Sequence, residues 1–167
     1  MLSEAVEDYL KAVYAVYDKH GKVTTSLLAE KMSVSPASAT SMIKKMAETK
    51  LVAHEPYQGV TLTEMGLKLA LEIIRHHRLV ELYLSEALGV PWDKVHAEAE
   101  KWEHVLSEDV EDRMDKFLGY PTADPHGAPI PDRNGEMVCK KRIHLVDLQP
   151  NDTATVVEVS DHDPELL

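Results

Sequence analysis

One short stretch of the sequence gathers side chains of the types that bind divalent metal ions. His96, Glu100, Glu103 and His104 follow one another at helical spacing, on a helix that we expect over 92–106. At ~100° per residue, the four side chains fall within a sector of roughly 100° around that helix. The apolar residues of the helix occupy a different sector: Val95, Ala99, Trp102 and Leu106. The polar side chains therefore converge, which favours a cation site over a solvated helix face.

The spacing along this helix predicts two metal sites rather than one. Its last three polar residues are close enough to share an ion, whereas His96 lies about 12 Å from His104 along the axis, at ~1.5 Å per residue. On a long helix expected over 64–88, His77 and Glu81 form an i,i+4 pair that could complete the site at His96. A single pair of this kind is usually a surface ion pair of small energy. Two helices with matching clusters favour metal binding.

Catalytic chemistry is less well supported by the same residues. The sequence has no H-E-x-x-H motif, and none of its nine histidines has a glutamate three residues earlier, as paired di-iron carboxylate sites require. Cys139 lacks the neighbours of a nucleophile, and the sequence has no glycine-rich phosphate loop. A metal-dependent enzyme is therefore the weaker alternative, and we expect no catalytic residues.

The elements that precede these residues have the order of a winged helix-turn-helix, which is a DNA-binding unit. Ser35 suits the N-cap of its second helix, and Pro36 suits the first helical position. Residues 56–59 carry a turn pattern between two strand-like segments and would form the wing. The expected elements are helices at 4–18, 25–32 and 36–49 and strands at 51–55 and 60–63.

The helix expected over 36–49 would lie in the major groove of DNA. Small side chains near its start let it approach base edges, and lysines further along meet phosphates. Its exposed face has no arginine, so bidentate reading of guanine is not expected. The candidate DNA contacts are Ser35, Pro36, Ala37, Ser38, Thr40, Ser41, Lys44 and Lys45, with Tyr57 and Gln58 on the wing.

The rest of the chain is predicted to be mainly helical. The long helix at 64–88 is apolar on more than one side, so it needs two neighbours, one of which could be another subunit. Helices at 92–106 and 107–118 follow. Residues 120–136 are rich in proline and glycine and are expected to form a linker, and 156–159 resemble a strand of a small β unit.

Composition places the chain among soluble intracellular proteins. It has 167 residues, of which 44% are apolar and 28% charged, values that exclude a disordered or fibrous chain. A single cysteine excludes a disulfide scaffold, no uncharged apolar run reaches about 18 residues, and the acidic N-terminus is unlike a signal peptide. The net charge of −11 is concentrated after residue 66, because residues 1–66 hold seven lysines against eight acids. Cations are thus expected partners of the second part.

The sequence resembles the diphtheria toxin repressor family over about residues 3–133. Four segments carry the resemblance: 94–107 around the histidine and glutamate cluster, 57–63 at the wing, 75–79 on the long helix, and 124–131. Residues 144–167 resemble the start of the family's SH3-like domain. The implied fold is mainly α, with a winged helix-turn-helix domain at 1–66, a helical metal-binding and dimerisation domain at 67–136, and a partial SH3-like β segment at 137–167.

The resemblance implies a cytoplasmic, homodimeric transcriptional repressor of metal-uptake genes. Such a protein binds a palindromic operator in double-stranded DNA when it is loaded with divalent metal, and it needs neither a membrane nor an organic cofactor. Two ions per subunit are expected, with manganese as the metal and iron(II) as the alternative. Iron-type members have a cysteine where this chain has Glu100 and a methionine where it has Asp8. One manganese-type branch has an acid where it has Lys11.

The resemblance also implies which residues are metal ligands. The primary site would use Asp8, Glu100, Glu103 and His104. A second site would draw on His77, Glu81 and His96, or on Glu81 with Asp124 and His126. His77 could serve either site, and Asp161 and Asp163 are further candidates.

Metal binding would control DNA binding through the first helix, which carries Asp8. Without metal, crowded carboxylates repel one another and this helix is free to move, whereas a divalent ion neutralises them and ties it to the helix of Glu103. The coupling between metal and DNA must be reciprocal. The competing hypotheses are a winged-helix regulator that senses an organic ligand and, behind it, the metal-dependent enzyme.

Overall fold

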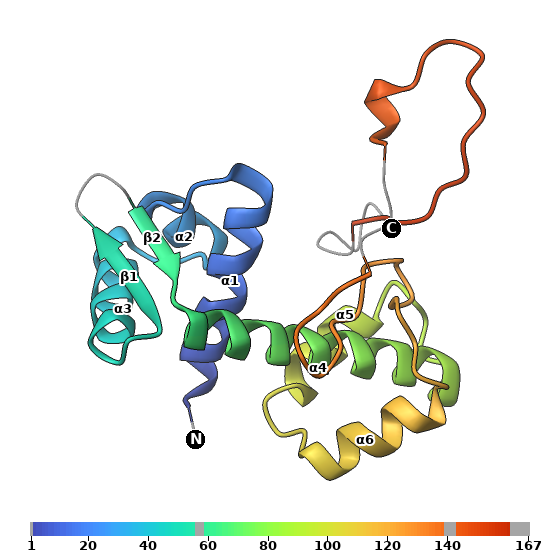
Figure 1. Cartoon of the computed structure of the whole chain (residues 1–167), viewed down its shortest axis with the longest axis horizontal. Helices are drawn as coiled ribbons and strands as arrows, with labels where there is room; N and C mark the ends of the chain where they lie inside the picture. Colours follow the sequence, from blue (N-terminus) through green and yellow to red (C-terminus); the bar gives the residue numbers. More distant parts are fainter. Residues whose placement is uncertain (1, 56–58, 139–142, 161–167) are drawn as a thin grey trace. The chain divides into compact units, whose positions relative to one another are not determined.

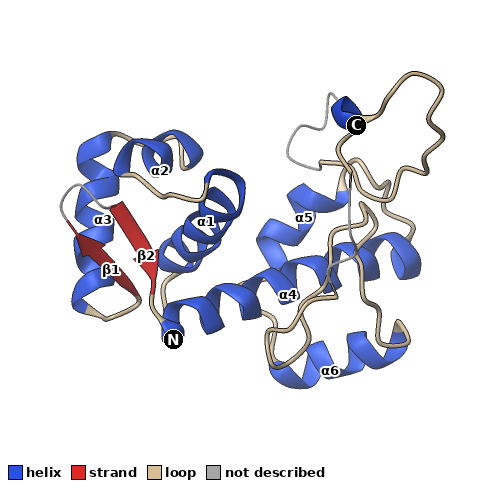
Figure 2. Cartoon of the chain, turned by 45° about the horizontal axis from the view of Figure 1, so that its top comes forward, coloured by secondary structure: helices blue, strands red, loops and turns tan. Residues whose placement is uncertain are grey.

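The computed structural model describes residues 2–55, 59–138 and 143–160. The fold is mainly helical, with one two-stranded antiparallel sheet (Figures 1 and 2). The chain forms two compact units, Met1–Ile74 and Arg75–Leu167. The division falls inside a helix that begins at Glu64, because Ala70 and Ile73 of its first turns belong to the core of the first unit. The domain boundary predicted at 66 stays a prediction. No helix in the described part of the chain is long and apolar enough to cross a membrane.

The first unit contains three helices and a β-hairpin, as the sequence predicted. Its helices are α1 (Glu4–His20), α2 (Thr25–Lys31) and α3 (Pro36–Glu48), and its strands are β1 (Val52–Glu55) and β2 (Gly59–Leu62) (Figure 1). The strands are antiparallel, with Val52 opposite Leu62. The core between the helices and the hairpin includes Leu10, Val13, Leu28, Ile43, Met46 and Val60.

Local residue choices explain where these elements begin and end. Ser35 caps α3 by accepting a hydrogen bond from the Ser38 N–H at 3.1 Å, and Pro36 takes the first helical position, as predicted. Thr63 likewise caps the next helix by accepting from the Gly66 N–H at 3.0 Å. Gly59 starts β2 with φ +108°, where a Cβ atom would lie 2.3 Å from the carbonyl oxygen of Val23, so the position requires glycine.

The second unit is built on the C-terminal half of α4 (Glu64–Leu88), with α5 (Val95–Trp102) and α6 (Glu108–Phe117). Their shared core consists of Val80, Leu84, Val95, Ala99 and Met114. The helix predicted over 92–106 is too long at both ends. Residues 91–94 form a turn closed by the Lys94 N–H to the Pro91 carbonyl at 2.8 Å, and another turn follows Trp102. Glu103 and His104 therefore lie in a turn after α5 rather than on the helix.

Residues 120–136, predicted as a linker, instead form a folded loop of the second unit (Figure 2). The Ile130 N–H donates to the Thr122 carbonyl at 3.0 Å, and the Ile130 side chain is buried. The Arg75 guanidinium on α4 donates to the Pro131 carbonyl at 2.8 Å. Proline and glycine here shape turns that pack against helices, so the composition predicted irregular backbone but not its packing in the second unit.

Residues 137–167 were predicted to form a partial small β domain, and the part of this segment that the structure describes, 137–138 and 143–160, contains no strand. The regular element present is a short 3₁₀ helix, Leu145–Asp147. Residues 156–159 form no strand, and the Val159 N–H donates to the His126 carbonyl at 3.0 Å rather than to a neighbouring strand. Extended backbone becomes a β-strand only when another strand completes its hydrogen bonds.

Candidate metal centre

The second unit brings together all of the predicted metal ligands except Asp8. Helix α4 contributes His77 and Glu81, which lie one turn apart on the same face. Helix α5 and the turn that follows it contribute His96, Glu100, Glu103 and His104. The folded loop contributes Asp124 and His126. Asp8 lies on α1 of the first unit, where its role stays a prediction, and Asp161 and Asp163 lie outside the described residues.

Three donor atoms from α4 and α5 form a nearly equilateral triangle. His77 Nε2 lies 3.0 Å from Glu81 Oε1 and 3.0 Å from His96 Nδ1, and His96 Nδ1 lies 3.1 Å from Glu81 Oε1. Ligands that meet at right angles on one ion, with bonds of about 2.1 Å, are themselves about 3 Å apart. The triangle therefore has the spacing of one face of an octahedral coordination shell.

His77 connects this triangle to the acids after α5. Its Nδ1 is hydrogen bonded to Glu103, and it lies 3.8 Å from an oxygen of Glu100. The other Glu103 oxygen lies 3.4 Å from His104 Nε2. The sequence left His77 open between two sites, and the structure turns one ring nitrogen toward each group. A histidine held by a carboxylate at one nitrogen and offering the other is the usual arrangement of a metal ligand.

A second group of donors lies on the other side of the Glu81 carboxylate. Glu81, Asp124 and His126 each offer a ligand atom within 4.8 Å of the others, with Glu81 Oε2 3.9 Å from His126 Nδ1. The three residues expose only 0, 6 and 3% of their surface. Carboxylates this deeply buried need a cation or several hydrogen bonds to compensate for lost hydration.

The protein orients Asp124 and His126 through one atom each and leaves another facing Glu81. The His126 Nε2–H donates to the Trp92 carbonyl at 2.8 Å, which leaves a lone pair on Nδ1. Asp124 Oδ1 accepts from the backbone N–H groups of His126 and Ala128 at 2.8 and 3.0 Å. Among the described residues, His126 Nδ1 and Asp124 Oδ2 are buried without a hydrogen-bond partner. Asp124 Oδ2 lies 3.8 Å from Arg78 Nε, and the role of Asp124 Oδ2 and His126 Nδ1 as metal ligands stays a prediction.

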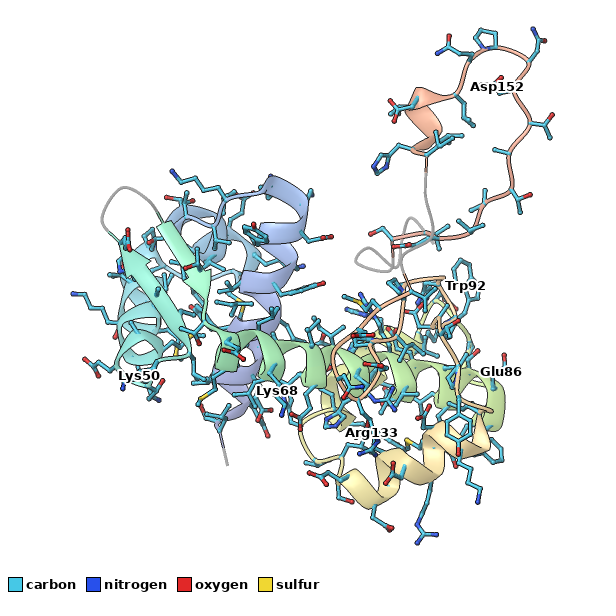
Figure 3. The ribbon with its side chains drawn as sticks, viewed as in Figure 1. Lys50, Lys68, Glu86, Trp92, Arg133 and Asp152 are labelled. Atoms are coloured by element: carbon cyan, nitrogen blue, oxygen red, sulfur yellow. The ribbon has the colours of Figure 1, made fainter. Side chains whose placement is uncertain are left out.

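Sequence reasoning missed Trp92, whose ring also lies 5.4 Å from the His126 ring, beside α5 (Figure 3). Trp92 contributes its backbone carbonyl, and because every residue type has one, the sequence carries no signal for this role.

The electrostatics of the group favour an added positive charge. Burial raises the pKa of Asp124, and the negative charge of Glu81 raises it further. Burial lowers the pKa of His77, but hydrogen bonds to Glu103 and Glu81 outweigh burial and raise it above its usual value. The donor set is carboxylate and imidazole, which suits manganese and iron(II) better than soft ions. The residues therefore fit a divalent cation; Cys139 lies outside the described residues.

A second buried group of charges, which the sequence did not predict, lies between α4 and α6. Arg75 Nε donates to Glu111 at 2.5 Å and Nη2 donates to Asp115 at 2.7 Å. His76 Nε2 lies 3.3 Å from Glu111, and Arg133 lies beside the same acid at 4.0 Å (Figure 3). Burial alone would raise the pKa of Glu111, but His76 and Arg75 outweigh it and lower that pKa to about 2.

The predicted DNA face of α3 is exposed in the first unit. Ala37, Ser38, Ser41, Lys44 and Lys45 are all accessible, while Ala39, Ile43 and Met46 are buried on the opposite side. Pro36 and Ser35 are exposed at the start of the helix, and the Thr40 hydroxyl donates to the Pro36 carbonyl at 2.7 Å. Tyr57 and Gln58 lie outside the described residues. Contact of this face with DNA stays a prediction.

Two known domain families match this chain. The iron dependent repressor, N-terminal DNA binding domain, matches residues 1–60. The iron dependent repressor, metal binding and dimerisation domain, matches residues 63–132.

Full-length relatives and a solved structure are also similar. The iron-dependent repressor IdeR of Mycobacterium tuberculosis is 38% identical over 130 residues, which is 78% of this chain and 56% of IdeR. An HTH-type transcriptional regulator of Methanocaldococcus jannaschii is 34% identical over 118 residues, 70% of this chain and 94% of that protein. The structure of a manganese-dependent transcriptional repressor in complex with manganese is 41% identical, with a TM-score of 0.89 over 96% of this chain and 74% of the other. The chain spans little more than half the length of IdeR.

Proposed function

The chain belongs to the iron-dependent repressor family of metal-dependent transcriptional repressors, and on this premise we propose that it is a manganese-activated, homodimeric repressor of metal-uptake genes in the cytoplasm. Membership of the family confirms the resemblance found in the sequence and the preference for a regulator over an enzyme. The observation that carries the proposal is the buried group of carboxylates and imidazoles around His77 and Glu81, whose triangle of donors fits one divalent ion.

Manganese is preferred because of the donor types. The candidate ligands supply carboxylate oxygens and imidazole nitrogens, and Glu100 stands where iron-type members carry a cysteine. Hard oxygen donors suit manganese, whereas thiolate favours softer ions. The similar solved structure is itself described as a manganese-dependent repressor. Iron(II) is the alternative metal.

In this proposal the bound ion supplies positive charge and a fixed set of bonds. Glu103, His104 and Glu100 would hold one ion, with Asp8 as the further ligand that the resemblance implies. Asp8 is on α1, which precedes the helix-turn-helix, so a tie to this residue would bias the position of the DNA-reading helices. An ion that favours the DNA-binding state must itself bind more tightly in the presence of DNA.

Two other features support the proposed homodimer and its palindromic operator: exposed apolar residues near α6 and the exposed face of α3. One matching domain is described as a dimerisation domain, and the flanks of α6 expose the apolar side chains of Val105, Phe117 and Tyr120, which a second subunit could cover. A dimer reads two half-sites of a palindrome, with α3 of each copy in the major groove. Ser41, Lys44 and Lys45 on the exposed face of α3 are the side chains offered to it.

The test is DNA binding with and without metal. A palindromic site selected by the protein from a random library would be titrated in manganese, in anaerobic iron(II), in zinc and in chelator. We expect chelator to weaken binding by a factor of about 5–150, the usual range for coupled sites. Glu103→Gln and His104→Ala should abolish the response, whereas Glu98→Gln on α5, an acid paired with Lys101 at 2.7 Å, should keep it.

Two outcomes would overturn the proposal. Binding that ignores chelator would favour a winged-helix regulator of an organic ligand. Activation by zinc alone, or a manganese midpoint that does not move in Glu100→Cys, would contradict the choice of metal.

A further inference from the structure

The carboxylate of Glu81 lies between the two groups of donors in the second unit. Its Oε1 is the third corner of the triangle with His77 Nε2 and His96 Nδ1, at 3.0 and 3.1 Å. Its Oε2 faces the folded loop, where His126 Nδ1 is 3.9 Å away. Each oxygen of one side chain thus faces a different set of ligand atoms, and the side chain is fully buried between them.

His77, Asp124 and His126 are each held by a group other than Glu81, whereas His96 Nδ1 is hydrogen bonded to Glu81 itself. On one side, Glu103 holds the His77 ring through Nδ1. On the other, the Trp92 carbonyl holds the His126 ring, and backbone N–H groups hold Asp124. Ligands that keep their orientation before the ion arrives define two separate positions for an ion. Only the Glu81 carboxylate is offered to both among the described residues.

A shared carboxylate has an electrostatic consequence for two neighbouring ions. Two divalent cations repel each other at short range, and a negative group between them reduces that repulsion. In their absence, Glu81 and Asp124 repel each other in a buried environment. The first ion removes part of this repulsion and fixes the Glu81 carboxylate, which prepares the second position.

We propose that Glu81 bridges a pair of divalent cations, one bound with His77 and His96 and the other with Asp124 and His126, and that the two positions fill together. With the ion proposed at Glu100, Glu103 and His104, this gives three ions per subunit in place of the two expected from the sequence. The inference rests on the proposed function only in assuming that the chain binds manganese or a similar ion. It adds that Glu81 is a ligand of both ions, so that its substitution removes two ions, whereas substitution of another ligand of the pair removes one.

Metal content distinguishes the bridge from two independent sites. After equilibrium dialysis against manganese, His96→Ala and His126→Ala should each lose one ion per subunit at saturating metal, whereas Glu81→Gln should lose both. Glu86→Gln, on the same helix but exposed near its C-terminal end (Figure 3), is the matched control and should lose none. Loss of a single ion in Glu81→Gln would overturn the bridge.

Electron paramagnetic resonance of the unaltered protein gives a test that does not depend on how any variant folds. Two manganese(II) ions joined by one carboxylate should give the broadened spectrum of an exchange-coupled pair. His96→Ala and His126→Ala should each restore the spectrum of isolated ions. A wild-type spectrum of isolated ions alone at full loading would contradict the proposal, whatever the result of the DNA-binding experiment.

Joint filling can be followed at one position by tryptophan fluorescence. Trp92 contacts His126, and Trp102 is the chain's other tryptophan, so Trp102→Phe leaves a reporter of the loop position. Manganese should quench Trp92, and adding His96→Ala should raise the manganese midpoint of that quenching several-fold. An unchanged midpoint would show that the two positions fill independently. DNA binding that requires metal could persist in that case, so the two proposals fail separately.

Discussion

Two groups of buried charges lie on the same half of α4, and they are balanced differently. Around Arg75, one guanidinium donates to Glu111, Asp115 and the Pro131 carbonyl, so the protein supplies both signs of charge. Around Glu81, the neighbours are Asp124 and imidazoles, and two of their buried atoms have no hydrogen-bond partner among the described residues. Arg78 Nε lies 3.8 Å from Asp124 Oδ2, but the Arg78 guanidinium donates to the Pro129 carbonyl. In the first group an arginine is hydrogen bonded to both acids, although His76 Nε2 is buried without a hydrogen-bond partner among the described residues. In the second group, the proposed function assigns the balancing charge to a cation from solution.

The geometry of a helix allows both groups to use adjacent residues. Successive side chains on a helix point about 100° apart, so Arg75 and His77 face different neighbours. Arg75 and His76 meet α6, and His77 and Glu81 meet α5 and the folded loop. The acids around Arg75 are thus hydrogen bonded by a guanidinium, whereas Glu81 is in contact with two imidazoles, a donor set that supports the proposed metal site.

The largest expected effect comes from removing the arginine of the first group. Arg75→Met removes the guanidinium that donates to Glu111 and Asp115 and leaves Glu111 only His76 and Arg133 among the described residues, which should lower the free energy of unfolding by about 3–5 kcal/mol. Urea unfolding measures the change. Arg113→Met breaks an ion pair with Asp109 that is exposed on α6, and should cost less than about 1 kcal/mol. Equal losses in the two variants would show that the Arg75 group is not a buried network.

Acid should weaken the Arg75 group through Glu111. The pKa of Glu111 is lowered to about 2 in the folded protein, so the unfolded state takes up a proton first as the pH falls. The contribution of Glu111 is complete above its ordinary pKa of 4.5 and is lost as the pH falls from there toward 2. At about 1.36 kcal/mol per unit, the loss is on the order of 3 kcal/mol.

Urea unfolding at several acid pH values checks this expectation. The protein should become steadily less stable below its ordinary carboxyl range, and Glu111→Gln should remove most of this part of the pH dependence. An equal slope in Glu111→Gln would place the responsible carboxyl group elsewhere.

The smallest expected effect comes from adding metal to the second group. Free manganese at about 100 times its Kd should raise the free energy of unfolding by about 2.7 kcal/mol per site. Because the Arg75 group needs no external ion, Arg75→Met should gain the same increment as the unaltered protein. Thermal unfolding with and without manganese measures both gains. A gain that disappears in Arg75→Met would show that the two groups are one coupled network.

Local spacing was enough to predict most helices and strands and one of the two buried charge groups, the one around Glu81. The pair His77 and Glu81 was visible at i,i+4, and α4 begins and ends as predicted. Periodicity extended α5 too far, because it does not register the turn at 91–94 or the turn that carries Glu103. The helical spacing nevertheless predicted correctly that His96, Glu100, Glu103 and His104 lie close together.

The Arg75 group was beyond reach of the sequence because its partners are distant along the chain. Glu111 is 36 residues from Arg75, and the Pro131 carbonyl is 56 residues away. Glu111 and Asp115 form an i,i+4 pair that resembles many exposed pairs on helices. The folded loop at 120–136 was predicted to be a linker for a related reason, since tight turns and linkers are both rich in proline and glycine. Gly127, with φ +90° and a Cβ position only 1.9 Å from the Val157 carbonyl oxygen, is there because a backbone packs against it.

The burial of the residues around Glu81 affects how fast a bound ion would dissociate. The loop that covers these residues is fastened by Arg78, which donates to the Pro129 carbonyl, and by the bond between Ile130 and Thr122. If an ion binds at Asp124 and His126, its departure would require these buried side chains to be uncovered, and local openings of a loop are far slower than side-chain motions. The delay before an ion departs is then set by the loop. A cell whose metal supply falls would keep this protein loaded through that delay, so the molecule would report the supply of the recent past.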